Sequence, residues 1–206
     1  SRGAYRRYVH NLGMQATRLF DAVGDIHFFT DRSTFTAFWR NARRSRVLFP
    51  EAYTPQSPDF TLDGAPIYGT RQLYTDDAPA DAVCSLRPPE HHLDLARRWL
   101  ARHVHGDRTV VTVTLRETSV RAEWNSNIGE WQKLIDHFAG TNLSFVVLRD
   151  FATVYDNPAL TGENVVDCSE AVLDLVFRAA LYEVAGLNLL VLNGPCSLCF
   201  FNPRCN

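Results

Sequence analysis

Long apolar runs are missing from this 206-residue chain, and no stretch approaches the roughly 18 apolar residues that a membrane-spanning helix needs. The net charge of -2 also gives no basic surface for a nucleic acid or another polyanion. Lysine is nearly absent, because Lys133 is the only one, and the cations are therefore almost all arginines. An arginine presents a planar fork of hydrogen-bond donors, which suits phosphate and carboxylate groups.

Two motifs are also absent, a glycine-rich dinucleotide-binding motif and a complete set of zinc ligands. No Gly-x-Gly-x-x-Gly motif follows a predicted strand, which argues against a dinucleotide-dependent redox enzyme. The five cysteines are an odd number with irregular spacing, so we expect reduced thiols and a cytoplasmic location. Cys196, Cys199 and Cys205 are a set of soft ligands, but the second ligand pair of a zinc ribbon is missing. We therefore predict no metal site and no cofactor.

The part of the chain after Pro89 alternates apolar segments of two kinds. Runs rich in β-branched residues alternate with segments whose apolar residues recur every three or four positions, which is typical of strands alternating with helices. The near-continuous apolar strands indicate a sheet that is covered on both faces. This pattern predicts an α/β fold, a Rossmann-like parallel sheet with flanking helices. The expected helices are 92–103, 128–138 and 169–185, and the expected strands are 109–115, 143–148 and 188–192.

The first part of the chain predicts a partial second α/β lobe followed by a connector. Prolines and glycines punctuate residues 50–89, which is typical of a loop-rich segment between domains. We therefore expect two domains, with 1–85 as the partial lobe and connector and 86–206 as the Rossmann-like domain. The elements expected in the lobe are helices at 5–23 and 33–42 and strands at 25–30 and 46–49.

Polar residues follow the first of the expected parallel strands, at the edge where such sheets bind ligands. Arginine forks and amides gather there beside one aromatic residue, and the loop leads into a helix N-terminus that favours an anion. We predict that this loop binds a ligand. The alternative is that Arg116 and Glu117 form a surface ion pair and that Asn127 only caps the helix. The predicted ligand residues here are Arg116, Arg121, Asn125 and Asn127, beside Trp124.

The other two strands end in shorter polar motifs. Arg149 and Asp150 follow the second strand, where such a pair holds a ribose or base, or else forms a structural salt bridge. Asn193, Gly194 and Pro195 follow the third strand and precede Ser197. Glycine lets a backbone approach a ligand closely and proline suits a first helical turn, so this motif predicts contact with a diphosphate. The same three residues also make an ordinary turn.

These motifs resemble the sugar-donor-binding domain of GT-B glycosyltransferases, and in particular the heptosyltransferase-like group, over residues 86–206. In that group the last motif reads Asp, Ser or Thr, Gly, Pro, any residue, His, Leu, Ala, and it wraps the nucleotide diphosphate. Here Gly194, Pro195 and Leu198 match, whereas Leu192 stands in place of Asp and Ser197 in place of His. The chain is also similar to uncharacterised bacterial proteins that share the runs at 114–117 and 125–127.

The resemblance implies a metal-independent glycosyltransferase that moves a sugar from a nucleotide-diphosphate sugar to a glycan or another small hydroxyl acceptor. Residues 1–85 are then the acceptor side and supply the base, for which His10, His27 and Asp31 are the candidates, with Asp25 also available. A complete enzyme of this type is longer at both ends, so we expect a fragment or a reduced form. The alternatives are a non-catalytic nucleotide- or sugar-binding module, and a structural or interaction domain of the same fold.

Overall fold

The computed structural model describes residues 2–20, 31–44, 85–119, 122–191 and 194–206. The chain forms two compact units, of which the first comprises 1–23 together with 84–206 and the second comprises 24–83. The predicted boundary at residues 85 and 86 thus lies at one junction between the units. The first 23 residues, however, belong with the sheet-containing unit.

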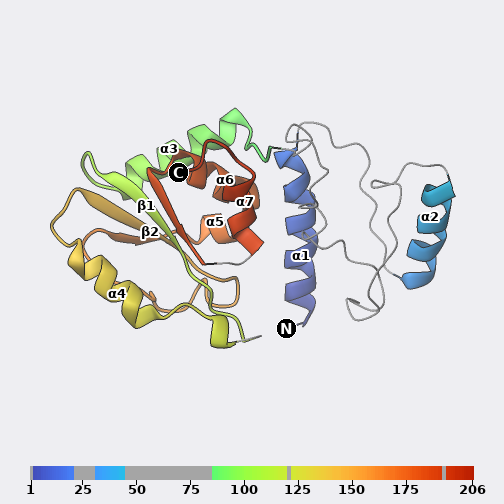
Figure 1. Ribbon diagram of the computed structural model, residues 1–206, viewed down its shortest axis with the longest axis horizontal. Coiled ribbons are helices and arrows are strands. Elements are labelled where there is room, and N and C mark those ends of the chain that lie inside the picture. The colour runs from blue at the N-terminus through green and yellow to red at the C-terminus, as the bar shows by residue number, and fades with distance from the viewer. Residues whose placement is uncertain (1, 21–30, 45–84, 120–121, 192–193) are drawn as a thin grey trace, which may run out of the picture. The chain divides into compact units, whose positions relative to one another are not determined.

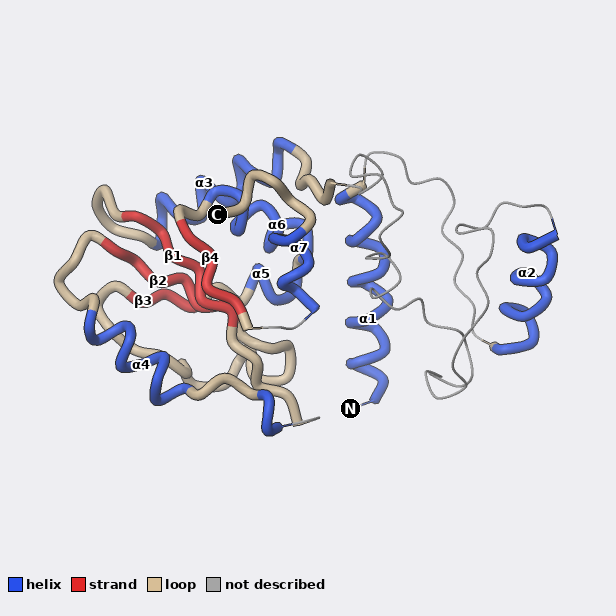
Figure 2. Tube along the Cα trace, viewed as in Figure 1, coloured by secondary structure: helices blue, strands red, loops and turns tan. Residues whose placement is uncertain are grey.

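A four-stranded, fully parallel sheet forms the centre of the first unit. Its order is β3-β2-β1-β4, as Figure 2 shows. The register brings the last residue of β1, Thr114, beside Leu148 of β2 and Leu190 of β4, so the carboxyl ends of these three strands share one edge. This confirms the predicted α/β fold with a Rossmann-like parallel sheet. The strands are β1 Thr109–Thr114, β2 Leu143–Leu148, β3 Val165–Asp167 and β4 Leu187–Leu190.

Helices cover both faces of the sheet because successive strand residues point to opposite sides. Val111, Val113 and Phe145 pack with Ile135 of α4 (Ile128–His137) on one face. Val146 and the other residues of the opposite set pack against the second layer of helices (Figure 1). That layer contains α3 Glu90–His103, α5 Glu170–Leu173, α6 Leu175–Val184 and α7 Ser197–Phe200.

The chain leaves β1 and β4 toward opposite faces of the sheet. After β1 it enters α4, whose Ile128 packs on one face, and after β4 it enters α7, whose Leu198 is buried on the other face. Since β1 and β4 are neighbours, their carboxyl ends mark the topological switch point, where open α/β sheets bind ligands. The site is therefore expected between the loops that follow these two strands.

The N-terminal helix α1 (Arg2–Ala16) packs beside the start of α6. Gln15 fixes it there, because its Oε1 accepts from the Leu175 backbone N–H at 2.7 Å and its Nε2 donates to the Leu173 carbonyl at 3.3 Å. Leu19, in the 3-10 helix η1 (Thr17–Leu19), enters the core between α3 and α6. The described helices include none that is long and apolar enough to cross a membrane.

Two predicted helices differ from the observed ones, and one observed strand was not predicted. The helix expected at 169–185 is interrupted at Asp174, which is extended (φ -116°, ψ 107°) and whose carboxylate accepts from the Val176 and Phe177 N–H groups at 2.9 Å. Asp174 thus ends α5 and caps α6. The short strand β3 was not predicted, and the helix expected at 5–23 ends at Ala16. In the second unit, the predicted helix is confirmed as α2 (Arg32–Arg44), while the strands expected at 25–30 and 46–49 lie outside the described residues.

Candidate functional site

Arg116 lies two residues beyond β1 at the switch point. Ser126 holds its backbone, since the Arg116 N–H donates to Ser126 Oγ at 2.9 Å and the Ser126 N–H donates to the Arg116 carbonyl at 2.9 Å. The Arg116 guanidinium carbon lies 5.7 Å from the ring centroid of Trp124. Its Nε is buried and makes no hydrogen bond in the described part of the chain. The backbone is thus fixed while the cation keeps unused donors.

Trp124 places a partly exposed aromatic ring next to this cation. It ends the 3-10 helix η4 (Ala122–Trp124), and 56% of its surface is exposed. A large exposed ring costs hydrophobic free energy in water, and aromatic faces at binding sites take up sugar rings or nucleic-acid bases by stacking. Arg116 and Trp124 together therefore offer donors for an anion and a platform for a ring.

The two amides predicted as ligand residues in this loop serve the loop itself. Asn125 closes it on Thr118, because its Oδ1 accepts from the Thr118 N–H at 3.1 Å and its Nδ2 donates to the Thr118 carbonyl at 2.9 Å. Asn127 is the N-cap of α4 and accepts from the Glu130 N–H at 3.3 Å. This is the role given by the alternative interpretation of the sequence, in which Asn127 only caps the helix. Arg121 lies outside the described residues.

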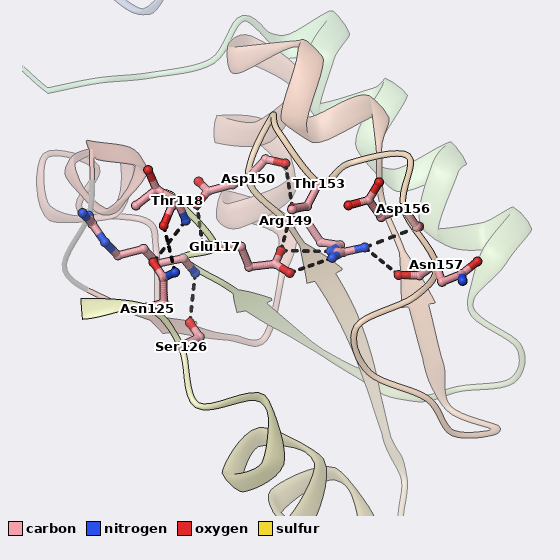
Figure 3. A network of polar contacts seen from close by, with 10 residues as sticks. Glu117, Thr118, Asn125, Ser126, Arg149, Asp150, Thr153, Asp156 and Asn157 are labelled. Atoms are coloured by element: carbon pink, nitrogen blue, oxygen red, sulfur yellow. Dashed lines mark hydrogen bonds and ion pairs between the residues drawn. The ribbon is translucent and has the colours of Figure 1, made fainter. Parts of the chain in front are cut away.

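Arg149, which follows β2, is fully engaged within the protein (Figure 3). Its Nη2 donates to Glu117 Oε1 at 2.6 Å and its Nε to Glu117 Oε2 at 2.9 Å, while Nη1 donates to the Asn157 carbonyl at 2.8 Å. Thr153 adds a hydroxyl bond to Glu117 at 2.9 Å, and Asp150 accepts from the Glu117 N–H. All three guanidinium nitrogens of Arg149 therefore already donate within the protein, and a structural ion pair is the role observed, with Glu117 as its partner.

Burial and charge act in opposite directions within this network. Burial raises the pKa of Glu117, but hydrogen bonds from Arg149 and Thr153 and the charge of Arg149 outweigh it and hold that pKa below its usual value. The Glu117 hydrogen bonds raise the pKa of Arg149 in turn. Asp167, at the end of β3, behaves differently, because burial raises its pKa although Arg149 lowers it. The pair Arg149–Glu117 is thus charged.

The motif after β4 makes a tight turn and one turn of helix. Gly194 and Pro195 lie in the 3-10 helix η5 (Gly194–Cys196), and Ser197 begins the four-residue helix α7. A helix of one turn has only a weak dipole, so these residues support an anion less than the sequence motif implies. Asn193 lies outside the described residues.

The candidate bases are placed less favourably than expected. Asp31 caps α2, accepting from the Thr34 N–H at 2.8 Å and from the hydroxyls of Ser33 and Thr34 at 2.5 and 2.6 Å. These hydrogen bonds lower the pKa of Asp31 to about 2, which makes it a weak base. His10 is exposed on α1. Both His27 and Asp25 lie outside the described residues.

Sequence reasoning missed a buried polar cluster beneath the switch point. Thr114 Oγ and the Tyr182 hydroxyl lie 2.7 Å apart, and Arg178 Nε donates to the same hydroxyl at 3.0 Å. Arg178 is 4% exposed and Tyr182 and Thr114 are fully buried. One feature of the sequence could have indicated this cluster. A helix segment that is apolar all round is buried, and Arg178 lies inside the apolar run 175–182, so a buried arginine could have been predicted there.

The candidate site therefore comprises Arg116 and Trp124 in the loop after β1, and the buried cluster of Arg178 and Tyr182 that contacts Thr114, the last residue of that strand. Arg149 and Glu117 brace the neighbouring loops and stand apart from it. This arrangement can bind an anion next to a flat ring. Comparisons of the chain with protein-family models, with curated proteins and with solved structures find no match.

Proposed function

We propose that the protein binds a nucleotide-diphosphate sugar at the carboxyl edge of its sheet and transfers the sugar to a hydroxyl acceptor, as a metal-independent glycosyltransferase. The observation that carries the proposal is the state of Arg116. Its guanidinium lies at the switch point with a buried Nε that has no hydrogen-bond partner in the described residues. Buried donors in proteins are nearly always satisfied, so an unsatisfied one at a ligand-binding edge indicates a ligand.

The charges around Arg116 support an anionic ligand. The ion pairs of the described residues use Arg97, Lys133, Arg149 and Arg204, and Arg116 takes part in none of them. Glu117, the neighbouring carboxylate, is bound to Arg149. Within the described residues Arg116 therefore has no counter-ion, and a phosphate group fits its fork of donors.

A nucleotide sugar combines the two kinds of group that the site accommodates. Its diphosphate suits Arg116, and its base or sugar ring suits the exposed face of Trp124. Glycosyl transfer leaves negative charge on the departing diphosphate, and an arginine held by a fixed backbone stabilises that charge without a metal. His10 is the candidate base in the unit that contains the sheet.

A non-catalytic nucleotide- or sugar-binding module is the second candidate function. The observation that favours it is Asp31, a candidate base whose two carboxylate oxygens are both occupied in capping α2. Such a module keeps the Arg116 and Trp124 site and lacks a proton acceptor for the incoming hydroxyl.

Thermal unfolding and titration calorimetry with UDP, GDP, ADP and CMP test the binding site. The variants are Arg116→Ala and, as a matched control, Arg108→Ala, which changes an arginine at the opposite end of the same strand. We expect at least one nucleotide to raise the Tm of the wild type and of the control, and its affinity to fall about tenfold or more in Arg116→Ala. Absence of stabilisation by all four nucleotides would overturn the proposal.

A second assay separates the two candidate functions. The nucleotide that binds is supplied as its sugar derivatives, and release of free nucleotide is followed with and without hydroxyl acceptors. Release that depends on Arg116 supports the transferase, whereas binding without release supports the module.

A further inference from the structure

Arg178 carries a buried positive charge that the described residues do not neutralise. The residue is 4% exposed, and within the described residues its guanidinium makes one hydrogen bond, from Nε to the Tyr182 hydroxyl at 3.0 Å. It belongs to none of the ion pairs that the described residues form. A buried charge without a counter-ion is unfavourable for folding, because the charge loses its hydration. Its retention therefore needs a reason other than stability.

The two thiols and the phenol whose pKa values the charge of Arg178 lowers all have raised pKa values nonetheless. Burial raises the pKa of Cys168 to about 12, although the charge of Arg178 acts in the opposite direction. Burial likewise raises the pKa of Tyr182. For Cys199, the hydrogen bond with Cys205 and then burial raise the pKa. These thiols and the phenol are consequently neutral neighbours.

The topology places Arg178 at the same edge of the sheet as Arg116. Helix α6 runs antiparallel to the strands, because it follows the carboxyl end of β3 and leads through Gly186, whose N–H donates to the Val110 carbonyl near the start of β1. The N-terminus of α6 therefore lies toward the carboxyl edge. Arg178 is one helical turn closer to that edge than Tyr182, and helical side chains lean toward the N-terminus.

Thr114 shows that the cluster of Arg178 and Tyr182 lies at the carboxyl end of β1. It is the last residue of β1, and its hydroxyl lies 2.7 Å from the Tyr182 hydroxyl that Arg178 contacts. Arg116 follows Thr114 by two residues, a rise of about 6.6 Å along an extended chain. The two arginines thus come from different elements, β1 and α6, to the carboxyl end of the same strand.

We propose that Arg178 is the second cation of an anion-binding site at the β1–β4 switch point and that it binds the diphosphate of the nucleotide proposed above. This inference rests on the proposed function for the identity of the ligand. Tyr182 is a positioning residue, which orients the guanidinium through its hydroxyl. A diphosphate carries more charge than one arginine neutralises. A site with two cations should therefore bind a diphosphate more tightly than a monophosphate.

Inorganic pyrophosphate and inorganic phosphate are the probes, titrated calorimetrically into the full chain. We expect the wild type to bind pyrophosphate more tightly than phosphate. Arg178→Met should weaken pyrophosphate binding about tenfold or more. Arg178→Lys keeps the charge but loses the planar fork of donors, so its affinity for pyrophosphate should lie between those of the wild type and Arg178→Met. Tyr182→Phe keeps the charge and loses its orientation, so it provides a second variant should Arg178→Met fail to fold, and we expect a severalfold loss.

The outcomes distinguish this inference from the proposed function. Pyrophosphate binding that is equal in the wild type, Arg178→Met and Tyr182→Phe overturns the role of Arg178, as does its absence from the wild type. If nucleotides bind through Arg116 while Arg178→Met binds UDP as tightly as the wild type, the proposed function stands and this inference fails. If pyrophosphate binding depends on Arg178 but no nucleotide binds, the anion site stands and the proposed function fails.

Discussion

Glu117 and Arg149 join the loops that follow the neighbouring strands β1 and β2 through two parallel hydrogen bonds of 2.6 and 2.9 Å. Glu117 directly follows Arg116 in the chain, yet the two side chains have different partners. By binding Arg149, Glu117 is removed from Arg116 as a counter-ion. The brace between the loops, and a cation at the switch point that forms no ion pair with another described residue, are therefore two results of one arrangement.

Breaking this brace from one side should destabilise the protein strongly. The side chains of Arg149 and Glu117 are only 8% and 15% exposed, and removing one partner of such a pair leaves the other charge buried. We expect Glu117→Gln to lower the free energy of unfolding by about 3 kcal/mol or more, measured by urea denaturation. The control is Glu130→Gln, which removes an exposed pair with Lys133 and should cost under about 1 kcal/mol. Equal losses in the two variants would contradict a structural role for the brace.

The lowered pKa of Glu117 predicts how the free energy of unfolding responds to acid. The pKa of Glu117 is below its ordinary value of 4.5 in the folded state, so its contribution is present above about pH 4.5 and is lost as the pH falls through the folded-state pKa. Asp167 acts in the opposite direction, since burial raises its pKa and its ionisation is penalised as the pH rises. Asp167 titrates in the wild type and in Glu117→Gln alike, but the charge of Glu117 also raises the pKa of Asp167, so comparing the two proteins cancels only the part of the Asp167 contribution that burial and Arg149 cause.

We expect the difference in unfolding free energy between these two proteins to be largest near neutral pH and to shrink in acid, measured from about pH 7 to about pH 3. Urea midpoints at each pH provide the measurement. A difference that stays constant across this range would show that ionisation of Glu117 does not contribute through its pKa.

Much of the sheet was predictable because its strands carry a strong local signal. The strand at 143–148 was predicted with its observed bounds, and the parallel arrangement followed from the alternation with helices. The three-residue strand β3 was missed because its pairing with β2 supplies most of its definition and no local run marks it. The break at Asp174 was missed for a related reason, since the apolar pattern continues across it while its carboxylate starts a new helix.

The sheet edge at which the polar loops lie was predictable, and the partners of their side chains were less so. The carboxyl-edge rule located Arg116 and Arg149 correctly at one edge, but sequence alone did not reveal that Glu117, 32 residues away, would occupy Arg149. Arg178 escaped notice because it lies inside an apolar helix, where its exposure and partners depend on tertiary packing. Local sequence thus gave the elements, and the assignment of each charge to a partner required the fold.

Trp124 should affect ligands that contain a ring and leave simple anions unaffected. Its ring is 56% exposed, so Trp124→Ala should change the free energy of unfolding little. Stacking of a base on an aromatic side chain contributes about 1–3 kcal/mol, and we expect a loss of this size for UDP or whichever nucleotide binds. Titration calorimetry with the nucleotide and with pyrophosphate measures both. Equal weakening of the two ligands would indicate that Trp124 acts by orienting Arg116 instead.

Substitutions of Asn127 distinguish a helix-capping role from a ligand-binding role for this side chain. Its side chain accepts from the Glu130 N–H, and loss of such a cap costs about 1 kcal/mol, so Asn127→Ala should lower the unfolding free energy by that amount. Asn127→Ser retains a capping oxygen but not the amide, and it should restore most of the stability. We expect both variants to bind nucleotide like the wild type, because the amide serves α4. Restored stability together with lost nucleotide affinity in Asn127→Ser would instead assign the amide to the ligand, since the hydroxyl replaces the cap and not the amide donor.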